Sequence, residues 1–226
     1  MQDSQRAEGR PTLVIFDCDG VLVDSEPVSG VVLQRILKAR GEDLTIEEID
    51  RRYRGWRLEE VATDFFARRG EPLDPSLATE IRDTTMTALG EGIEAIDGVG
   101  DLLRQLIAAG IDCCVASSGS IEKMHLTLGQ TGLLPLLQSA LYTAQDVPNG
   151  KPAPDVFLHA AKGMGRDPAE TVVIEDSAAG ARGARAAGMR VIGYSAGRPE
   201  DEAALHAVGA DVVARMDEVP ALIGIA

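Results

Sequence analysis

Cysteines, basic residues and long apolar runs are all scarce in this chain of 226 residues, and each shortage excludes a class of protein. The three cysteines form no paired pattern, which excludes a disulfide-stapled fold and predicts a reducing, cytoplasmic location. Lys and Arg number 22 against 36 Asp and Glu, and the formal net charge of −14 argues against nucleic acid as a partner. No stretch approaches the roughly 18 consecutive apolar residues of a membrane span, so we expect no membrane association.

The rest of the composition is that of an ordinary globular protein, with 45% hydrophobic and 26% charged residues. The length suits one sizeable core, or a core domain with a smaller second domain. Residues 1–10 are polar and lack the apolar segment of a secretory signal, so we expect a short frayed leader there. The chain has no long apolar seam, and we therefore expect a monomer.

Short apolar segments rich in β-branched residues alternate with helical patterns along most of the chain. Strands are predicted at residues 12–16, 111–116, 171–174 and 190–194, with weaker signals at 140–142 and 211–213. Helical periodicity occupies residues 100–109, 121–130, 155–164, 178–187 and 201–208. This alternation predicts an α/β fold, with a parallel sheet covered by helices on both faces.

One segment, which follows the first predicted strand and ends near residue 96, has helical periodicity and no convincing strand. Candidate helices lie at residues 28–39, 58–69 and 75–89. Such a length of helix is too much for the connection between two neighbouring strands. The segment is therefore predicted to be a separate helical domain, entered near residues 24–27 and left near residues 95–98.

Polar residues follow several of the predicted strands, at the sheet edge where ligands bind in open parallel folds. These residues are Asp17 and Asp19 after the first strand, Ser117 and Ser118 after the second, Lys151 in a Pro- and Gly-rich loop, and Glu175 and Asp176 after a later strand. Taken singly, each has an ordinary explanation as a turn residue, a helix cap or solvated surface. Their joint occurrence at four points of one rim is what indicates a site.

These residue types suit the transfer of a phosphoryl group. Several carboxylates in one place repel one another unless a hard cation such as Mg²⁺ neutralises them. A lysine and serine hydroxyls can hold the remaining phosphoryl oxygens. One Asp carboxylate can attack phosphorus, and a second, two residues along, can protonate the leaving oxygen and later activate water.

Four segments resemble the sequence motifs of the haloacid dehalogenase superfamily, specifically its phosphatase and phosphomutase branch. They are residues 16–25 (FDCDGVLVDS), 115–119 (VASSG), 151–155 (KPAPD) and 173–180 (VIEDSAAG). The resemblance implies a Rossmann-like catalytic core at residues 11–25 and 96–226, with an α-helical cap domain at residues 26–95. It also implies a phosphatase that hydrolyses a small phosphorylated metabolite through an aspartyl-phosphate, with Asp17 as nucleophile and Asp19 as general acid and base.

The resemblance further implies a ligand set for Mg²⁺. Asp17, the Asp19 carbonyl and Asp176 would hold the ion, and Glu175 would assist. Ser117 and Lys151 would hold the phosphoryl group, with the hydroxyl of Ser118 beside them.

Other branches of the superfamily fit less well. The metal-free dehalogenases and the phosphonoacetaldehyde hydrolases lack an acid at the position of Asp19. A β-phosphoglucomutase-like sugar phosphomutase stays open as the enzymatic alternative, although the arginine that binds its second phosphate would fall at Leu58 here. A non-catalytic binding or regulatory protein is the third possibility, and such a protein would be expected to lose motif residues that are all present here.

Four arginines crowd residues 51–57 of the helical segment, against a strongly acidic background. This segment resembles the cap loop that closes over the leaving group, which makes Arg54, Gly55 and Arg57 the candidate specificity residues. Guanidinium groups suit a carboxylate, a sugar hydroxyl or a second phosphate. Sugar phosphates, polyol phosphates and phosphoglycolate all fit such a site. The S-x-x-K spacing of Ser120 and Lys123 is interpreted only as the start of a helix.

Overall fold

A parallel sheet forms the centre of the protein. The computed structural model describes residues 10–53, 56–137 and 140–225, and within them six strands pair in the order β3-β2-β1-β4-β5-β6. All neighbouring strands are parallel. The strands are β1 (Leu13–Phe16), β2 (Asp112–Ser117), β3 (Leu141–Thr143), β4 (Thr171–Glu175), β5 (Arg190–Tyr194) and β6 (Asp211–Val213). The weakly predicted strands are thus confirmed as β3 and β6.

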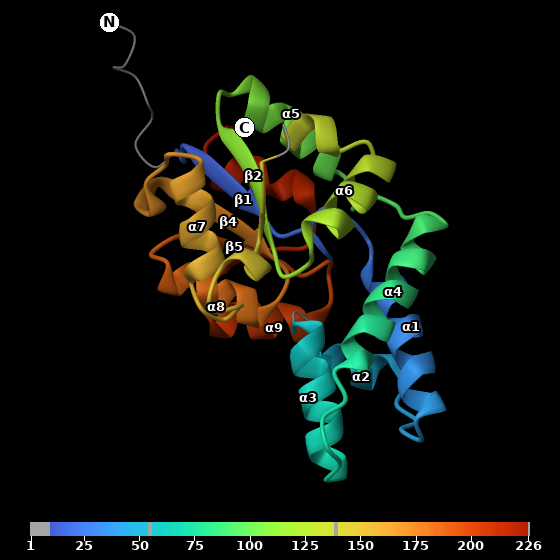
Figure 1. Ribbon diagram of the computed structural model, residues 1–226. Coiled ribbons are helices and arrows are strands. Elements are labelled where there is room, and N and C mark those ends of the chain that lie inside the picture. Colours follow the sequence, from blue (N-terminus) through green and yellow to red (C-terminus); the bar gives the residue numbers. More distant parts are fainter. Residues whose placement is uncertain (1–9, 54–55, 138–139, 226) are drawn as a thin grey trace, which may run out of the picture.

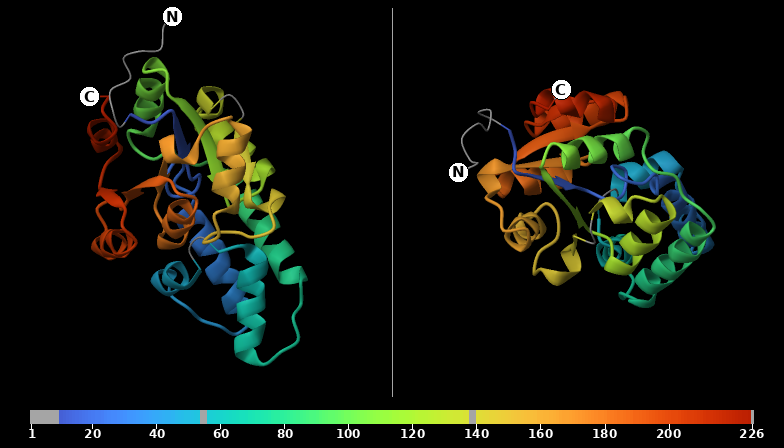
Figure 2. Two further views of the ribbon diagram at one scale, coloured as in Figure 1. Left: turned by 90° about the vertical axis from the view of Figure 1, so that its left-hand side faces the viewer. Right: turned by 90° about the horizontal axis from the view of Figure 1, so that it is seen from above.

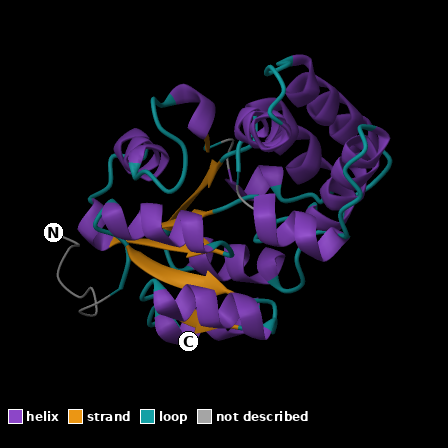
Figure 3. Ribbon diagram, turned by 90° about the horizontal axis from the view of Figure 1, so that it is seen from below, coloured by secondary structure: helices purple, strands orange, loops and turns teal. Residues whose placement is uncertain are grey.

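Helices cover both faces of this sheet (Figure 3). On one face lie α5 (Val99–Ala108), α6 (Ile121–Gln130) and α10 (Val219–Leu222), and on the other α7 (Asp155–Gly163), α8 (Ala178–Ala186) and α9 (Pro199–Ala207). Single 3₁₀ turns occur at Leu134–Leu137, Ala144–Asp146, Pro168–Glu170 and Met216–Glu218. The predicted α/β fold is confirmed, and no helix of the described residues is long and apolar enough to cross a bilayer.

The central strand β1 packs against helices on both faces of the sheet, which explains why its sequence is apolar throughout. Val14 and Phe16 pack into the hydrophobic cluster on one face of the sheet, and Leu13 and Ile15 pack into the cluster on the other. All four side chains are fully buried, because helices cover a parallel sheet on both sides. The burial of β1 fixes the position of the residues that follow it.

The helical segment forms a body of its own at one end of the sheet (Figure 1), and the turned views of Figure 2 show the same separation. It consists of α1 (Glu26–Ala39), α2 (Ile46–Tyr53), α3 (Leu58–Arg69) and α4 (Ser76–Gly90). These helices share one hydrophobic cluster, which includes Leu37, Phe65 and Leu77. Three of the four were predicted. The fourth, α2, is short and mostly charged, and only Ile49 and Tyr53 are buried on it.

The chain enters and leaves this helical segment at one point. Val23 forms an isolated antiparallel bridge with Ala95. On either side of it, the Asp24 N–H donates to the Glu94 carbonyl at 3.0 Å and the Ile96 N–H donates to the Leu22 carbonyl at 3.0 Å. The segment is therefore an insertion whose two ends lie side by side, next to the loop that follows β1.

Candidate active site

The predicted core residues meet at the carboxyl ends of three adjacent strands. Asp17 directly follows β1, and its N–H donates to the Ile174 carbonyl of β4 at 2.9 Å. Because β1 pairs with both β2 and β4, Ser117 and Glu175 at the ends of those strands fall on the same rim. Lys151 joins them from the loop before α7. All four side chains are buried.

Three carboxylates form a compact cluster on this rim. Asp17, Glu175 and Asp176 each offer an oxygen, and these oxygens lie within 4.8 Å of one another. Gly20, which has a φ of +78°, allows the close approach, since a Cβ there would lie 2.5 Å from Asp176 Oδ2. An all-oxygen donor set of this kind fits Mg²⁺.

Lys151 is held by two of these acids. Its Nζ lies 2.9 Å from Asp17 Oδ1 and 2.5 Å from Glu175 Oε1. The other oxygen of Glu175 accepts from the Ser177 N–H at 2.8 Å and from the Ser177 hydroxyl at 2.9 Å. Glu175 therefore positions the lysine and the loop after β4.

Burial sets the protonation of the nucleophile candidate. It raises the pKa of Asp17 to about 7, against the opposing attraction of Lys151 and with the added repulsion of Glu175. Burial likewise opposes the charge on Lys151, but Asp17 and Glu175 outweigh it and raise the pKa of the lysine. A bound divalent cation favours the ionised form of a carboxylate beside it.

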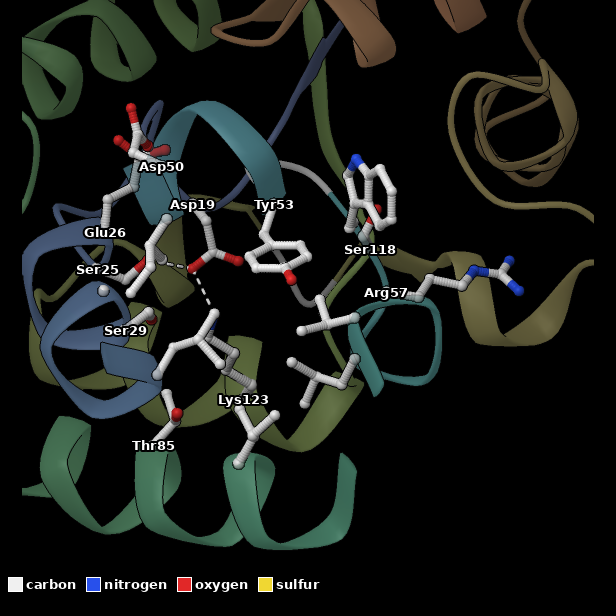
Figure 4. A pocket seen from close by; sticks show the side chains of 18 of the residues that line it. Asp19, Ser25, Glu26, Ser29, Asp50, Tyr53, Arg57, Thr85, Ser118 and Lys123 are labelled. Atoms are coloured by element: carbon white, nitrogen blue, oxygen red, sulfur yellow. Dashed lines mark hydrogen bonds and ion pairs between the residues drawn. The ribbon is translucent and has the colours of Figure 1, made fainter. Parts of the chain in front are cut away.

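Asp19 has different partners from the three clustered acids (Figure 4). Its Oδ1 accepts a hydrogen bond from the Ser25 hydroxyl and lies 2.7 Å from the Lys123 ammonium. Burial opposes ionisation of Asp19, but Lys123 and Ser25 outweigh it and lower the pKa of that carboxyl. The three-carboxylate cluster does not include the Asp19 side chain, for which the sequence predicts a metal contact only through the main-chain carbonyl.

Lys123 is the residue that sequence reasoning missed. Its S-x-x-K context does begin a helix, since the Ser120 hydroxyl oxygen accepts from the Lys123 N–H at 3.2 Å. A long side chain in the first turn of a helix leans back over the helix start, which here is the rim that carries Asp17 and Asp19. The tendency of such a side chain to point toward the helix start is the sequence signal that could have identified Lys123.

A cavity of about 930 Å³ opens between the rim and the helical segment. The sheet side contributes Ser118, Gly119 and Lys123 to its wall, and the helical side contributes Tyr53 and Thr85 (Figure 4). Its size is that of a site for a small molecule. The helical segment thus forms one wall of the space above Asp17.

Three arginines of this segment, Arg51, Arg52 and Arg57, have different surroundings in the fold. Arg51 is exposed, and Arg52 pairs with Glu42 at 3.0 Å. Arg57 extends away from Asp19 and Lys123 in Figure 4, and its Nη2 donates to the Ala144 carbonyl of the core at 2.5 Å. The predicted specificity residues Arg54 and Gly55 lie outside the described residues.

The comparisons with known proteins agree with this geometry. The sequence pattern of the haloacid dehalogenase-like hydrolases matches residues 11–188, from the strand before Asp17 to the end of the helix after Asp176. The chain belongs to the haloacid dehalogenase-like hydrolases. Recognition of this superfamily from the four motifs is therefore confirmed.

Several curated relatives in this family are named as phosphatases. The 6-phosphogluconate phosphatase of Escherichia coli is 31% identical over 85% of this chain and 86% of its own length. Hexitol phosphatase A of the same organism is 34% identical over 86% and 87% of the two chains. The prediction of an enzyme of the phosphoric monoester hydrolase class is thus confirmed at the level of the family.

A solved structure supports the fold. A haloacid dehalogenase-like protein from Agrobacterium tumefaciens superposes with a TM-score of 0.81 at 36% identity, and the match covers 94% of this chain and 97% of that one. The haloacid dehalogenase-like core and its helical insertion are therefore shared over nearly the full length.

Proposed function

We propose that this protein is a Mg²⁺-dependent phosphatase that hydrolyses a small phosphorylated metabolite through an aspartyl-phosphate on Asp17. The observation that carries the proposal is the position of Asp17, 2.9 Å from the Lys151 ammonium and in one cluster with the carboxylates of Glu175 and Asp176. This arrangement combines a nucleophile, a phosphate-binding cation and an oxygen donor set for a divalent ion.

The metal would be held by Asp17, Asp176 and the carbonyl of Asp19, with Glu175 nearby. When bound, Mg²⁺ supplies charge neutralisation for the phosphoryl oxygens and for the ionised nucleophile. Lys151 supplies a second positive charge beside the nucleophile.

The hydroxyl of Ser117 is well placed to bind the phosphoryl group. Its oxygen accepts from the Gly119 N–H at 2.9 Å, so its own proton stays available for a phosphoryl oxygen. Ser118 lines the cavity beside it. Together with Lys151, these groups hold the phosphoryl oxygens while the P–O bond is exchanged.

In this proposal Asp19 takes part in two proton transfers. As the carboxylate of Asp17 attacks phosphorus and the bond to the leaving oxygen breaks, Asp19 gives its proton to that oxygen. In this proposal the negative charge of the bound phosphoryl group raises the pKa that Lys123 and Ser25 lower in the free site, so Asp19 carries a proton in the complex. In the second half, Asp19 takes a proton from the water that attacks the aspartyl-phosphate, and Asp17 is released. The enzyme returns to its starting state with one phosphate and one alcohol formed.

Residues 26–95 act in this proposal as a cap domain that selects the leaving group. Their helices form a wall of the cavity and enter the core at one junction beside Ser25. The relatives named for 6-phosphogluconate and for hexitols support sugar-derived and polyol phosphates as the substrate class to test first.

The test is a panel of phosphorylated metabolites and one aryl phosphate, assayed for phosphate release with Mg²⁺ and with EDTA. Wild type should release phosphate only with the metal, and Asp17→Asn should abolish the release. Asp101→Asn, an exposed acid on α5, is the matched control and should keep full activity. Mg²⁺-dependent release by Asp17→Asn would refute the mechanism.

The same panel separates the mutase alternative. A sugar phosphomutase returns the phosphoryl group to the sugar and depends on a bisphosphate activator. The contact of Arg57 Nη2 with the core carbonyl of Ala144 supports the hydrolase, because one arm of that guanidinium is bound by protein and not by a second phosphate. Isomerised sugar phosphate in place of free phosphate would decide for the mutase.

A further inference from the structure

Within the described residues, Lys123 is the one side chain that forms an ion pair with the Asp19 carboxylate. The two groups lie 2.7 Å apart, and their side chains are 20% and 26% exposed. Lys123 and the Ser25 hydroxyl both engage the same oxygen, Oδ1 (Figure 4). No hydrogen bond within the described part of the chain engages Oδ2, which is therefore the oxygen left for the proton.

The backbone around Lys123 is fixed. Its N–H donates to the Ser120 hydroxyl oxygen at 3.2 Å, and its carbonyl accepts from the Thr127 hydroxyl at 3.0 Å. A Cβ added at Gly119 would be in ordinary contact with both members of the pair, 3.5 Å from Lys123 Cδ and 3.6 Å from Asp19 Oδ2. The first turn of α6 therefore fixes the backbone from which the Lys123 side chain reaches Asp19.

We propose that Lys123 is a positioning residue for the acid–base step: it holds Asp19 Oδ1 so that Oδ2 faces the leaving oxygen of the substrate. The inference rests on the proposed function, in which Asp19 is the general acid. The Oδ2 proton moves to the leaving oxygen as the P–O bond breaks, and Oδ2 regains a proton from the attacking water. Lys123 itself exchanges no proton in either half.

An ion pair that served only stability would have a different signature. It would change every substrate's turnover alike, or only the unfolding temperature. A group that orients the general acid matters most when the leaving group needs a proton. Phenolate leaves poorly without a proton, whereas 4-nitrophenolate leaves readily without one, and the two phenyl esters differ little in shape.

The test compares phenyl phosphate with 4-nitrophenyl phosphate for wild type and Lys123→Met. The quantity compared is kcat/KM, which reports the steps up to departure of the leaving group. Because general acids contribute about 10²–10⁴-fold, we expect Lys123→Met to lose about 10- to 100-fold on phenyl phosphate and less than about 5-fold on the nitrophenyl ester. Lys123→Gln, which keeps a hydrogen-bond donor, should recover part of the loss.

Two further variants make the result decisive. Lys162→Met removes an exposed lysine of α7 and should change neither substrate. Asp19→Asn calibrates the assay, because it should show the same leaving-group dependence in larger form. If Asp19→Asn shows none, the acid–base role in the proposed function is wrong. If Asp19→Asn shows it and both Lys123 variants fold but lose equally on the two esters, the positioning role is overturned.

Discussion

At the scale of single residues, neighbours in the sequence have separate tasks. Glu175 and Asp176 are adjacent, yet both oxygens of Glu175 are bound by Lys151 and Ser177, while Asp176 lies against Gly20. The sequence predicts that both acids lie at the site. It does not predict that Glu175 and Asp176 have different tasks, because the task of each acid depends on which loop its oxygens contact in the folded chain.

A buried glycine supports this division of tasks and allows a prediction. A Cβ on Gly180, in the first turn of α8, would overlap the carboxylate of Glu175. Gly180→Ala should therefore displace Glu175 and leave Lys151 without one of its two acids. We expect activity to fall at least about 100-fold, and the free energy of unfolding to fall by about 1–3 kcal/mol as in other overpacked sites.

Gly129→Ala is the matched control for that experiment. Gly129 also lies within a helix, but nothing stands within 4 Å of a Cβ there. The substitution should raise the free energy of unfolding by about 0.5–1 kcal/mol and leave activity unchanged. Steady-state assays and urea unfolding check both variants, and full activity in Gly180→Ala would contradict the interpretation.

At the scale of helices and strands, most of the core could be predicted from sequence because its signals are local. The apolar runs of β1 and β4 are buried on both faces, so they read as strands without tertiary information. The helix α2 could not be predicted in this way. Only two of its residues are buried, and Arg52 on its outer side pairs with Glu42, ten residues earlier in the chain.

The connection between α3 and the core gives a second prediction. Arg57, which precedes α3, donates to the Ala144 carbonyl, and a Cβ on Gly150 would overlap its guanidinium. Arg57→Ala and Gly150→Ala should therefore disturb the same contact. We expect each to lower kcat/KM, and the double variant to be no worse than the poorer single, with a coupling energy of about 1 kcal/mol.

The measurement is a double-mutant cycle on the best substrate of the panel. Gly90→Ala, at the end of α4 with nothing within 4 Å of its Cβ, serves as the control glycine. If the losses in kcat/KM of the two single variants add up in the double variant, Arg57 and Gly150 act separately. In that case Arg57 would return to its first interpretation as a substrate contact.

At the scale of the whole molecule, the buried acid on β1 links stability to pH. Burial raises the pKa of Asp17 from 3.8 to about 7, so the folded state binds a proton more tightly than the unfolded chain does. The stabilisation from that proton is complete below about pH 4 and is lost as the pH rises through about 7. Asp17→Asn removes the titrating group.

We therefore expect the metal-free protein to lose stability relative to Asp17→Asn between pH 5 and pH 8. Urea unfolding of both proteins in EDTA measures the difference, in which the titration of other groups largely cancels. Adding Mg²⁺ at pH 8 should raise the unfolding temperature of wild type more than that of the variant, since a ligand stabilises the state that binds it. If the difference in free energy of unfolding between wild type and Asp17→Asn stays constant across this pH range, the raised pKa of Asp17 is contradicted.

The bridge between Val23 and Ala95 has a consequence for the evolution of this fold. Because the polypeptide departs from the sheet and comes back at one place, the helical unit can be replaced as a cassette without cutting any strand. Its hydrophobic cluster is its own, so its residues can drift without loosening the sheet. If the helical unit selects the leaving group, as proposed, its exchange would change the substrate while Asp17 and its partners stay as they are.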